Sequence, residues 1–182
     1  ARPGEERRVQ IEGLAPNSEY DYSILGKGRV LAGGRFTTSP SENDPDKLRL
    51  AFGSCFHKIG LHNPNLSREV LNRQPHAMLL LGDIAVDDRN GNVSMHRSEY
   101  PLRDVSAPWQ EMVSNLPVYA AWDDHDYFDN DLSGIPRKFT DQDRNAVRKV
   151  WHQNWNNPPA EDDREGIYFN TRLGPVEVIM LD

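Results

Sequence analysis

The stretch AAWDDHDYFDND, residues 120–131, joins an apolar run to a dense group of acidic side chains. The run Val118–Trp122 predicts a buried β-strand, because a strand covered on both faces reads as a continuous hydrophobic segment. Five aspartates and one histidine follow it directly. A run of charged residues ordinarily forms a solvated surface. This run, however, directly follows an apolar strand that ends at Trp122, and the aromatic residues Tyr127 and Phe128 interrupt it. The stretch therefore predicts acidic side chains held at the end of a buried strand.

Two other predicted strands end in the same way. Leu48–Phe52 runs into Gly53-Ser54-Cys55, and Ala77–Leu81 runs into Gly82-Asp83. Ligands of α/β proteins bind beyond the carboxyl ends of the strands, so three parallel strands would bring these tips to one site. The simpler alternative is that Asp83 caps a helix and Cys55 is a core residue. For any one tip considered alone, this simpler alternative is favoured. For the three tips considered together, a shared site is the better explanation.

The remaining pattern alternates strands with helices, which is typical of a layered α/β domain over residues 48–182. Apolar residues at helical spacing predict helices over Asn65–Gln74 and Asp141–Asn154. Two apolar runs, Ile167–Thr171 and Val176–Leu181, flank Leu173-Gly174-Pro175 and predict a hairpin.

The first part of the chain has a different character. Alternating residues predict strands at Arg8–Ile11, Glu19–Leu25 and Arg29–Thr37. The segment Gly13–Tyr20 resembles the corner of a fibronectin type III domain, in which a tyrosine hydroxyl bonds back to the backbone. Three strands are too few for a sandwich, so residues 1–38 are interpreted as a partial fibronectin type III-like β module. The polar, proline-containing residues 39–47 are the predicted linker.

Composition excludes several classes of protein. The chain has 182 residues and a formal net charge of −7, which argues against a nucleic-acid-binding surface. No apolar run approaches the roughly 20 residues that a membrane span needs. Cys55 is the one cysteine, so no disulfide can form within the chain. An acidic protein can still bind a phosphorylated substrate if cations lie between the two.

The residue types at the three tips indicate a metal site. Carboxylates and a thiolate packed together repel one another unless cations neutralise them. The carboxylates suit calcium, magnesium, manganese or ferric iron, and the thiolate adds a softer ligand. Two adjacent metal ions can hold a phosphate and lower the pKa of a bound water, which then attacks phosphorus. A neighbouring histidine can protonate or stabilise the leaving oxygen.

The order and spacing of these motifs resemble those of the PhoD-like (alkaline phosphatase D) metallophosphoesterase family. The resemblance covers residues 48–182 and rests on Phe52-Gly53-Ser54-Cys55, Gly82-Asp83, Trp122–Asp126, Gly166–Phe169 and Val178–Asp182. It implies a calcineurin-like β-sandwich flanked by helices, of which this chain holds the N-terminal part. It also implies hydrolysis of phosphate mono- or diesters, calcium and iron as cofactors, and a secreted, periplasmic or cell-surface location.

The resemblance also implies roles for single residues. Cys55 matches the cysteine that binds iron, Asp83 the carboxylate that bridges the metals, and Asp124 a further metal ligand. His125 matches the catalytic histidine. Three neighbouring acids are candidate ligands or supports of ligands: Asp87, Asp123 and Asp126.

The sequence departs from the family pattern in two places. Val86 stands where the family usually has a tyrosine that binds iron, and Asp87 and Asp88 follow it. Either iron loses a ligand here or an aspartate supplies a harder oxygen. The family's remaining ligands lie beyond the Leu181-Asp182 element, so we expect this chain to lack a complete site.

Other polar residues are interpreted as structural or surface groups. These are His57, His62, His76, His96 and His152. Arg97 and Arg103 could meet a substrate phosphate, but they are interpreted as surface residues that face solvent. Two alternative functions stay open at this point. The chain could be a non-catalytic binding module stabilised by cations, or an inert fragment of an enzyme.

Overall fold

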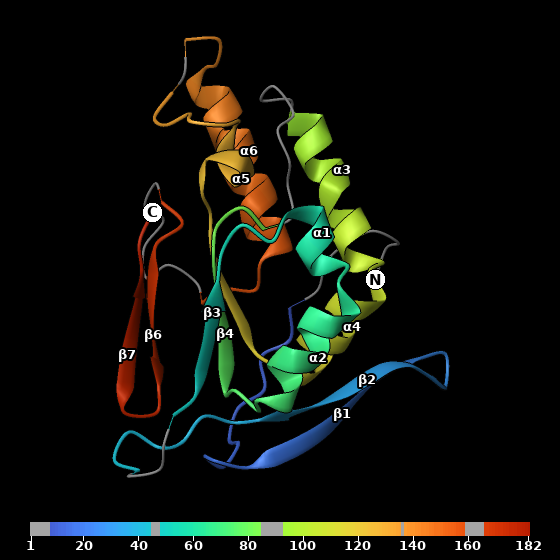
Figure 1. The fold of residues 1–182 in the computed structure, drawn as a ribbon. Coiled ribbons are helices and arrows are strands. Elements are labelled where there is room, and N and C mark those ends of the chain that lie inside the picture. The colour runs from blue at the N-terminus through green and yellow to red at the C-terminus, as the bar shows by residue number, and fades with distance from the viewer. Residues whose placement is uncertain (1–7, 45–47, 85–92, 136, 159–165) are drawn as a thin grey trace.

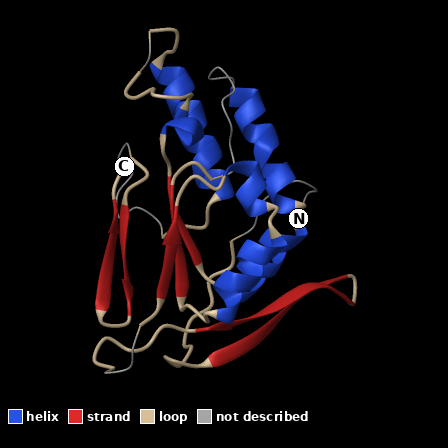
Figure 2. Cartoon of the chain, in the orientation of Figure 1, coloured by secondary structure: helices blue, strands red, loops and turns tan. Residues whose placement is uncertain are grey.

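The computed structural model describes residues 8–44, 48–84, 93–135, 137–158 and 166–182. Within these residues the strands form a parallel sheet and two antiparallel hairpins (Figures 1 and 2). The strands are β1 (Glu19–Gly26), β2 (Arg29–Thr37), β3 (Leu50–Gly53), β4 (Ala77–Leu81), β5 (Val118–Ala121), β6 (Phe169–Leu173) and β7 (Val176–Met180). The helices are α1 (His57–Leu61), α2 (Pro64–Asn72), α3 (Val93–Asp104), α4 (Ala107–Asn115), α5 (Asp124–Tyr127) and α6 (Asp141–Asn154).

The parallel sheet has β4 in its middle, between β3 and β5. Leu80 of β4 pairs with Gly53 of β3 and with Ala120 of β5. Because all three strands run in the same direction, their carboxyl ends lie at one edge of the sheet. The prediction that the three polar tips converge is therefore confirmed.

Strand β4 is covered on both faces, as its continuous apolar sequence predicts. Met78 and Leu80 pack into a core with Trp151 and other residues of the helical layer. Ala77 belongs to a second core on the opposite face, where it packs with Phe169 and the rest of the β6–β7 hairpin. Figure 2 shows the helices on one side of the sheet and this hairpin on the other. The described residues thus form a mixed α/β arrangement of helices, sheet and hairpin.

Helix α6 coincides with the predicted helix Asp141–Asn154. It begins with a capping box, in which the Thr140 side chain accepts from the backbone N–H of Asp143 and the Asp143 side chain accepts from that of Thr140. Val147, Val150 and Trp151 are buried on its inner face. The local cap and the apolar stripe agree, which explains why this helix could be predicted to the residue.

Arg103 was predicted to be a surface residue, and this is wrong. Its side chain is only 7% exposed. The guanidinium carbon lies 4.6 Å from the ring centre of Trp155, 5.0 Å from that of Tyr100 and 5.2 Å from that of Trp109. The negative faces of these rings stabilise the buried cation, so Arg103 belongs to the core between α3, α4 and α6.

The N-terminal residues agree only in part with the prediction. β1 and β2 form the expected hairpin, and the Tyr20 hydroxyl accepts a hydrogen bond of 2.8 Å from the backbone N–H of Ala15. Arg8–Ile11 is not a strand, because no described strand lies beside it to complete its hydrogen bonds. The side chain of Arg8 instead donates to the carbonyls of His152 and Trp155.

The hairpin rests on helix α4. β2 approaches α4 so closely that a Cβ at Gly34 would lie 2.0 Å from the carbonyl oxygen of Ser114. The fibronectin type III-like module is not confirmed, since the described part of it is this one hairpin. The division at residues 38 and 47 stays a prediction.

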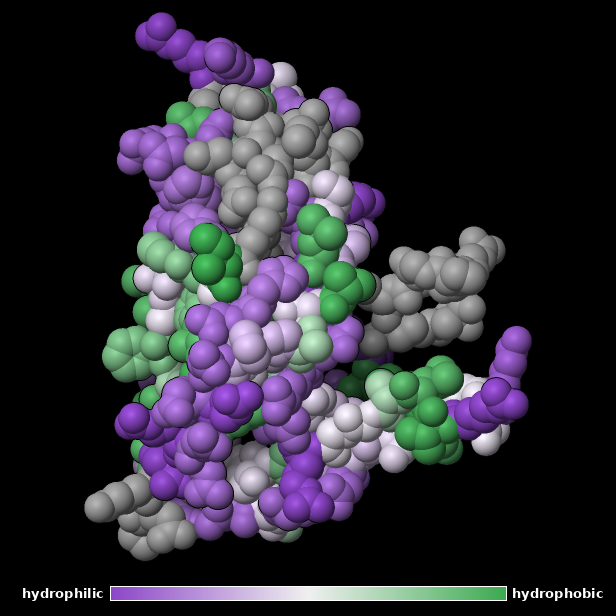
Figure 3. All heavy atoms as spheres, turned by 45° about the vertical axis from the view of Figure 1, so that its right-hand side comes forward, coloured by the Kyte–Doolittle hydropathy of each residue, from purple (hydrophilic) through white to green (hydrophobic). Residues whose placement is uncertain are grey.

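The tip of the hairpin carries exposed apolar side chains (Figure 3). They are Ile24, Leu25, Val30 and Leu31, each at least half exposed. Within the described residues this apolar surface is uncovered.

Among the described helices, none has the length and the hydrophobicity that crossing a bilayer requires.

The adjacent residues Leu80 and Leu81 test the position of β4. Leu80 is 0% exposed among the helices, whereas Leu81 points to the opposite face and is 43% exposed. We expect Leu80→Ala to lower the free energy of unfolding by about 2–5 kcal/mol, because it leaves a cavity. Leu81→Ala should cost about 1 kcal/mol or less. Urea denaturation of both variants is the measurement, and equal losses would contradict this placement of the sheet.

Candidate metal centre

The candidate site is built from the loops that follow β3 and β4. The backbone N–H of Cys55 donates to the carbonyl of Gly82 at 3.1 Å, and the N–H of His57 donates to the carbonyl of Asp83 at 3.0 Å. These two bonds continue the pairing of the strands past the edge of the sheet. They fix Cys55, His57 and Asp83 relative to one another.

The backbone of these two loops is strained at three residues. Cys55, His57 and Asp83 have φ angles of 55°, 45° and 53°, in the left-handed region that residues other than glycine seldom adopt. Each such residue costs on the order of 1–3 kcal/mol and persists only where the surrounding structure holds it. Such outliers cluster at functional sites, and here two of them, Cys55 and His57, lie beside the carboxylate of the third, Asp83. Four other non-glycine residues with positive φ lie in other turns of the chain: Asn17, Lys27, Gln74 and Asp131.

Gly82 allows the residues that follow β5 to approach the loop that follows β4. Its φ is +90°, and a Cβ at this position would lie 2.4 Å from Cβ of Asp123 and 2.8 Å from the backbone nitrogen of Asp123. Only glycine permits this approach of the tip of β4 to the tip of β5. The Gly82-Asp83 pair is therefore explained by packing as well as by chemistry.

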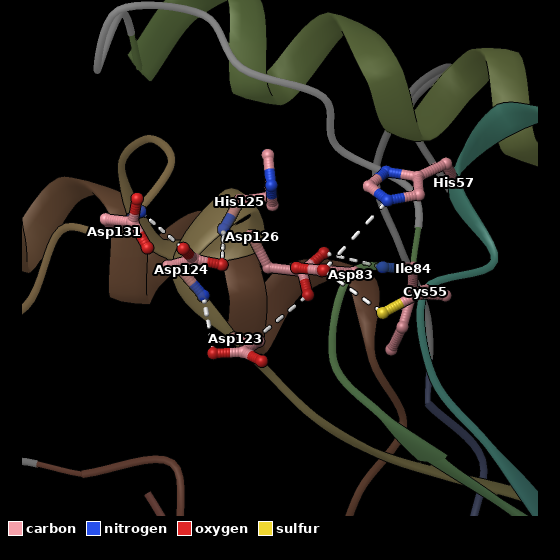
Figure 4. Close-up of polar contacts among 9 residues, drawn as sticks. All are labelled: Cys55, His57, Asp83, Ile84, Asp123, Asp124, His125, Asp126 and Asp131. Atoms are coloured by element: carbon pink, nitrogen blue, oxygen red, sulfur yellow. Dashed lines mark hydrogen bonds and ion pairs between the residues drawn. The ribbon is translucent and has the colours of Figure 1, made fainter.

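Asp83 occupies the centre of the cluster (Figure 4). Its Oδ2 lies 3.4 Å from Sγ of Cys55 and 4.0 Å from Nε2 of His57. One ligand atom from each of Asp83, Asp124 and His125 lies within 4.8 Å of the other two. Asp83 thus faces Cys55 and His57 on one side and Asp124 and His125 on the other.

The carboxylate of Asp83 is also incompletely satisfied. The residue is 7% exposed, and its buried Oδ1 accepts no hydrogen bond from any described residue. A buried carboxylate oxygen without a donor is costly, and a cation is the partner that this chemistry calls for. The carboxylates of Asp83 and Asp124 and the imidazole of His125 form one group that fits a metal ion, and the thiol of Cys55 lies next to this group, beside Asp83.

Asp124 is held by backbone donors. Its Oδ1 accepts from the N–H of His125 at 3.0 Å, and its Oδ2 accepts from the N–H of Asp131. The residue opens helix α5, and this helix also positions the ring of His125 (Figure 4). The two bonds fix the direction of the carboxylate.

Asp123 and Asp126 support the site by another route. They form the capping box of α5, in which the Asp123 side chain accepts from the N–H of Asp126 and the Asp126 side chain accepts from that of Asp123. Asp123 also accepts from the N–H of Asp124 at 2.9 Å. Asp126 is buried, and its two oxygens accept from the N–H groups of Ile84 at 3.2 Å and of Asp123 at 3.3 Å. Burial raises the pKa of Asp126 to about 7, against the backbone N–H groups, which lower it. Both acids thus bond to the backbone that carries Asp83 and Asp124.

Asp87, named as a candidate ligand, and Val86, which replaces the family tyrosine, lie outside the described residues. Cys55 is exposed and lies beside Asp83, so the alternative that it is a core residue is wrong.

His57 is the residue that the sequence analysis missed. It was interpreted as a structural or surface residue, but its ring lies beside Asp83 and meets the ring of His125 edge to face, with centres 5.3 Å apart. The available signal was its position two residues after Cys55, on the same strand tip. Spacing between histidines could not reveal it, because its neighbours in space come from other loops.

No protein-family model matches the chain, and no curated protein matches it in sequence. Among solved structures the chain is similar to PhoD, with a TM-score of 0.69 and 18% identity, over 91% of this chain and 37% of PhoD. It is also similar to a purple acid phosphatase isolated from yellow lupin (Lupinus luteus) seeds, with a TM-score of 0.63 and 19% identity, over 94% of this chain and 31% of that one.

The chain spans about a third of the length of each of these neighbours. At sequence identities this low, structural similarity establishes only that the fold is shared. The chain therefore has a mixed α/β fold in common with PhoD and a purple acid phosphatase. The expected PhoD-like relationship is confirmed at that level.

Gly82 and Gly28 provide a matched pair of variants. Both have positive φ, but a Cβ at Gly28 would meet no atom within 4 Å. We expect Gly28→Ala to cost about 1–2 kcal/mol through its backbone alone and to leave metal binding unchanged. Gly82→Ala should in addition displace Asp123 and weaken Mn²⁺ binding by about 10–100-fold, the effect of losing a support of a metal ligand. Calorimetric titration with Mn²⁺ measures this, and equal affinities in the two variants would contradict the role of Gly82.

Proposed function

We propose that the chain is the metal-binding part of a hydrolase that acts on phosphoric esters, of the PhoD-like phosphatase or phosphodiesterase type. The observation that carries the proposal is the place of Asp83. Its buried carboxylate lies between one pair of donors, Cys55 and His57, and a second pair, Asp124 and His125. A carboxylate between two donor sets is the arrangement that a bridging metal ligand needs.

Cys55, Asp83 and Asp124 would hold the metal ions, and His57 lies close enough to join them. When bound, such ions polarise the phosphoester and lower the pKa of the attacking water. Calcium and iron are the cofactors that the family resemblance suggests. The ligand set present here, two carboxylates with one thiol and imidazoles, accepts both hard and borderline cations.

His125 is the proposed acid that serves the leaving oxygen. Helix α5 holds its backbone, and its half-buried ring stands beside Asp83 and Asp124. A histidine in this place can donate a proton to the departing alkoxide or stabilise its charge. Because His125 lies near the two carboxylates, it could instead be a metal ligand. The two roles differ in their effect on bound metal when His125 is replaced.

The remaining parts of the proposal rest on the resemblance. The substrate is a phosphate mono- or diester, and the location is secreted, periplasmic or at the cell surface. The activity belongs to the whole protein, since the chain spans about a third of the length of its structural neighbours.

The first test replaces Asp83 by Asn, which keeps the size of the side chain and removes its charge. We expect the variant to lose bound metal and phosphoesterase activity together, because the shared ligand is gone. Asp21→Asn, in the exposed β1 strand, is the control and should change neither. Elemental analysis and turnover of nitrophenyl phosphate are the measurements. Since Asn caps a helix about as well as Asp, near-normal metal and turnover would favour the capping role.

The second test replaces His125 by Asn and compares two substrates. Loss of a general acid should lower turnover by about 10²–10⁴-fold. An alkyl phosphate should suffer more than nitrophenyl phosphate, whose leaving group needs little protonation. Bound metal should stay nearly constant. Loss of metal would instead identify His125 as a ligand, and equal losses for both substrates in a variant with a lower melting temperature would refute the catalytic role.

A further inference from the structure

A cleft of about 580 Å³ lies beside the candidate metal centre. It is bounded by the tip of β5, by α5 with the loop that follows it, and by one face of α6. The residues that matter for its chemistry are Trp122, Asp124, Tyr127, Arg144, Arg148 and Tyr168. Because Asp124 belongs to both the cleft and the metal centre, a group bound at the centre can extend into the cleft.

The aromatic part of the cleft is held rigidly. The ring of Trp122 packs against Tyr127 with centres 4.9 Å apart, and its Nε1 donates to Asp182 at 2.6 Å. The hydroxyl of Tyr127 donates to the carbonyl of Gly134. Tyr168 is 41% exposed at the rim. Aromatic side chains fixed in this way suit a flat or apolar organic group.

The cationic part of the cleft comes from α6. Arg144 and Arg148 are four residues apart, so they lie on the same face of the helix. Arg144 is paired with Asp141 at 3.0 Å. Arg148 has no ion pair with any carboxylate of the described residues, and the one hydrogen bond of its guanidinium is a 3.5 Å contact with Oδ1 of Asn145. A half-buried guanidinium with such weak partners is suited to an anion from outside the chain.

Among the described residues, the acids that line the cleft form no ion pair with Arg148, and each accepts hydrogen bonds from other groups. Asp123 caps α5, and Asp124 accepts from two backbone N–H groups. Asp182 accepts from Trp122 and from the N–H of Ile167. Burial raises the pKa of Tyr127, and the charges of Arg144 and Arg148 oppose that shift, which places both cations near its ring.

We propose that this cleft binds the organic part of the phosphoester and that Arg148 selects organic groups bearing a second anionic group, either a carboxylate or a further phosphate. The proposal rests on the proposed function, since the phosphoester itself sits at the metal centre. The aromatic residues receive an aryl or similarly flat group, and Arg148 pairs with the charge at its far end. Simple esters of uncharged alcohols are thus the weaker ligands.

Non-hydrolysable phosphonates test this directly on the Mn²⁺-loaded protein. Benzylphosphonate carries one anionic group, 4-carboxybenzylphosphonate adds a carboxylate, and p-xylylenediphosphonate adds a second phosphonate. By calorimetric titration we expect one or both doubly anionic compounds to bind about tenfold more tightly than benzylphosphonate, the effect of one charge-assisted hydrogen bond. Which of the two is preferred distinguishes a carboxylate from a phosphate as the second group.

Arg148→Gln should abolish this preference while leaving the affinity for benzylphosphonate and the bound metal unchanged. Arg68→Gln in α2 is a matched control, because Arg68 also bonds to the Asn three residues before it, at 3.3 Å, and does not line the cleft. This control should keep the full preference of the wild type.

The outcomes separate the two proposals. Equal affinities of all three compounds for the wild type, or a preference that survives in Arg148→Gln, overturns the role of the cleft. Failure to bind any of them does the same. Turnover of phenyl phosphate by the wild type is measured separately. Its absence together with an intact, Arg148-dependent preference refutes the hydrolase and retains the anion-selective cleft.

Discussion

The structure depends on one buried carboxylate, that of Asp83, in which one oxygen has no partner among the described residues. Asp83 sits at the end of the central strand with a left-handed backbone, and its Oδ1 has no hydrogen-bond donor among the described residues. Strain and an unmet acceptor both lower stability, on the order of 1–3 kcal/mol each. A fold retains such a group when an external partner completes it. The bonds from Cys55 and His57 to the Gly82-Asp83 backbone are what hold the group in that position.

The other acids of the site divide the work of binding and support. Asp124 faces the cluster, while Asp123 and Asp126 use their oxygens to cap α5 and to bond the backbone next to Asp83. This division limits the repulsion among the aspartates that follow one buried strand. The supporting acids accept hydrogen bonds from backbone N–H groups, and a bound cation would neutralise those that face the cluster. Arg148 is the converse case, a cation that faces the same region and forms no ion pair with an acid in the part of the chain that the structure describes.

Features set by local sequence could be predicted, and features set by distant contacts could not. β4, α6 and both hairpins follow from periodicity and from short turn or capping signals, and the convergence of Cys55, Asp83 and Asp124 follows from parallel strands alone. The sequence did not reveal the surroundings of His57 and Arg103, because these are set by residues distant in the chain. His57 lies beside the loop of Asp83. Arg103 packs among three aromatic rings, those of Tyr100, Trp109 and Trp155. Arg8–Ile11 alternates like a strand, yet a strand needs a neighbour, which sequence alternation does not supply.

Anomalous X-ray diffraction from crystals of the protein soaked in Mn²⁺ tests the central claim most directly. The account predicts an anomalous peak within bonding distance of the Asp83 carboxylate, with Asp124 or Cys55 as a further ligand of the same ion. The positive φ of Asp83 should be unchanged, because the backbone bonds from Cys55 and His57 hold the loop. Manganese bound elsewhere, with Oδ1 of Asp83 satisfied by an ordered water or a backbone N–H, would contradict the account.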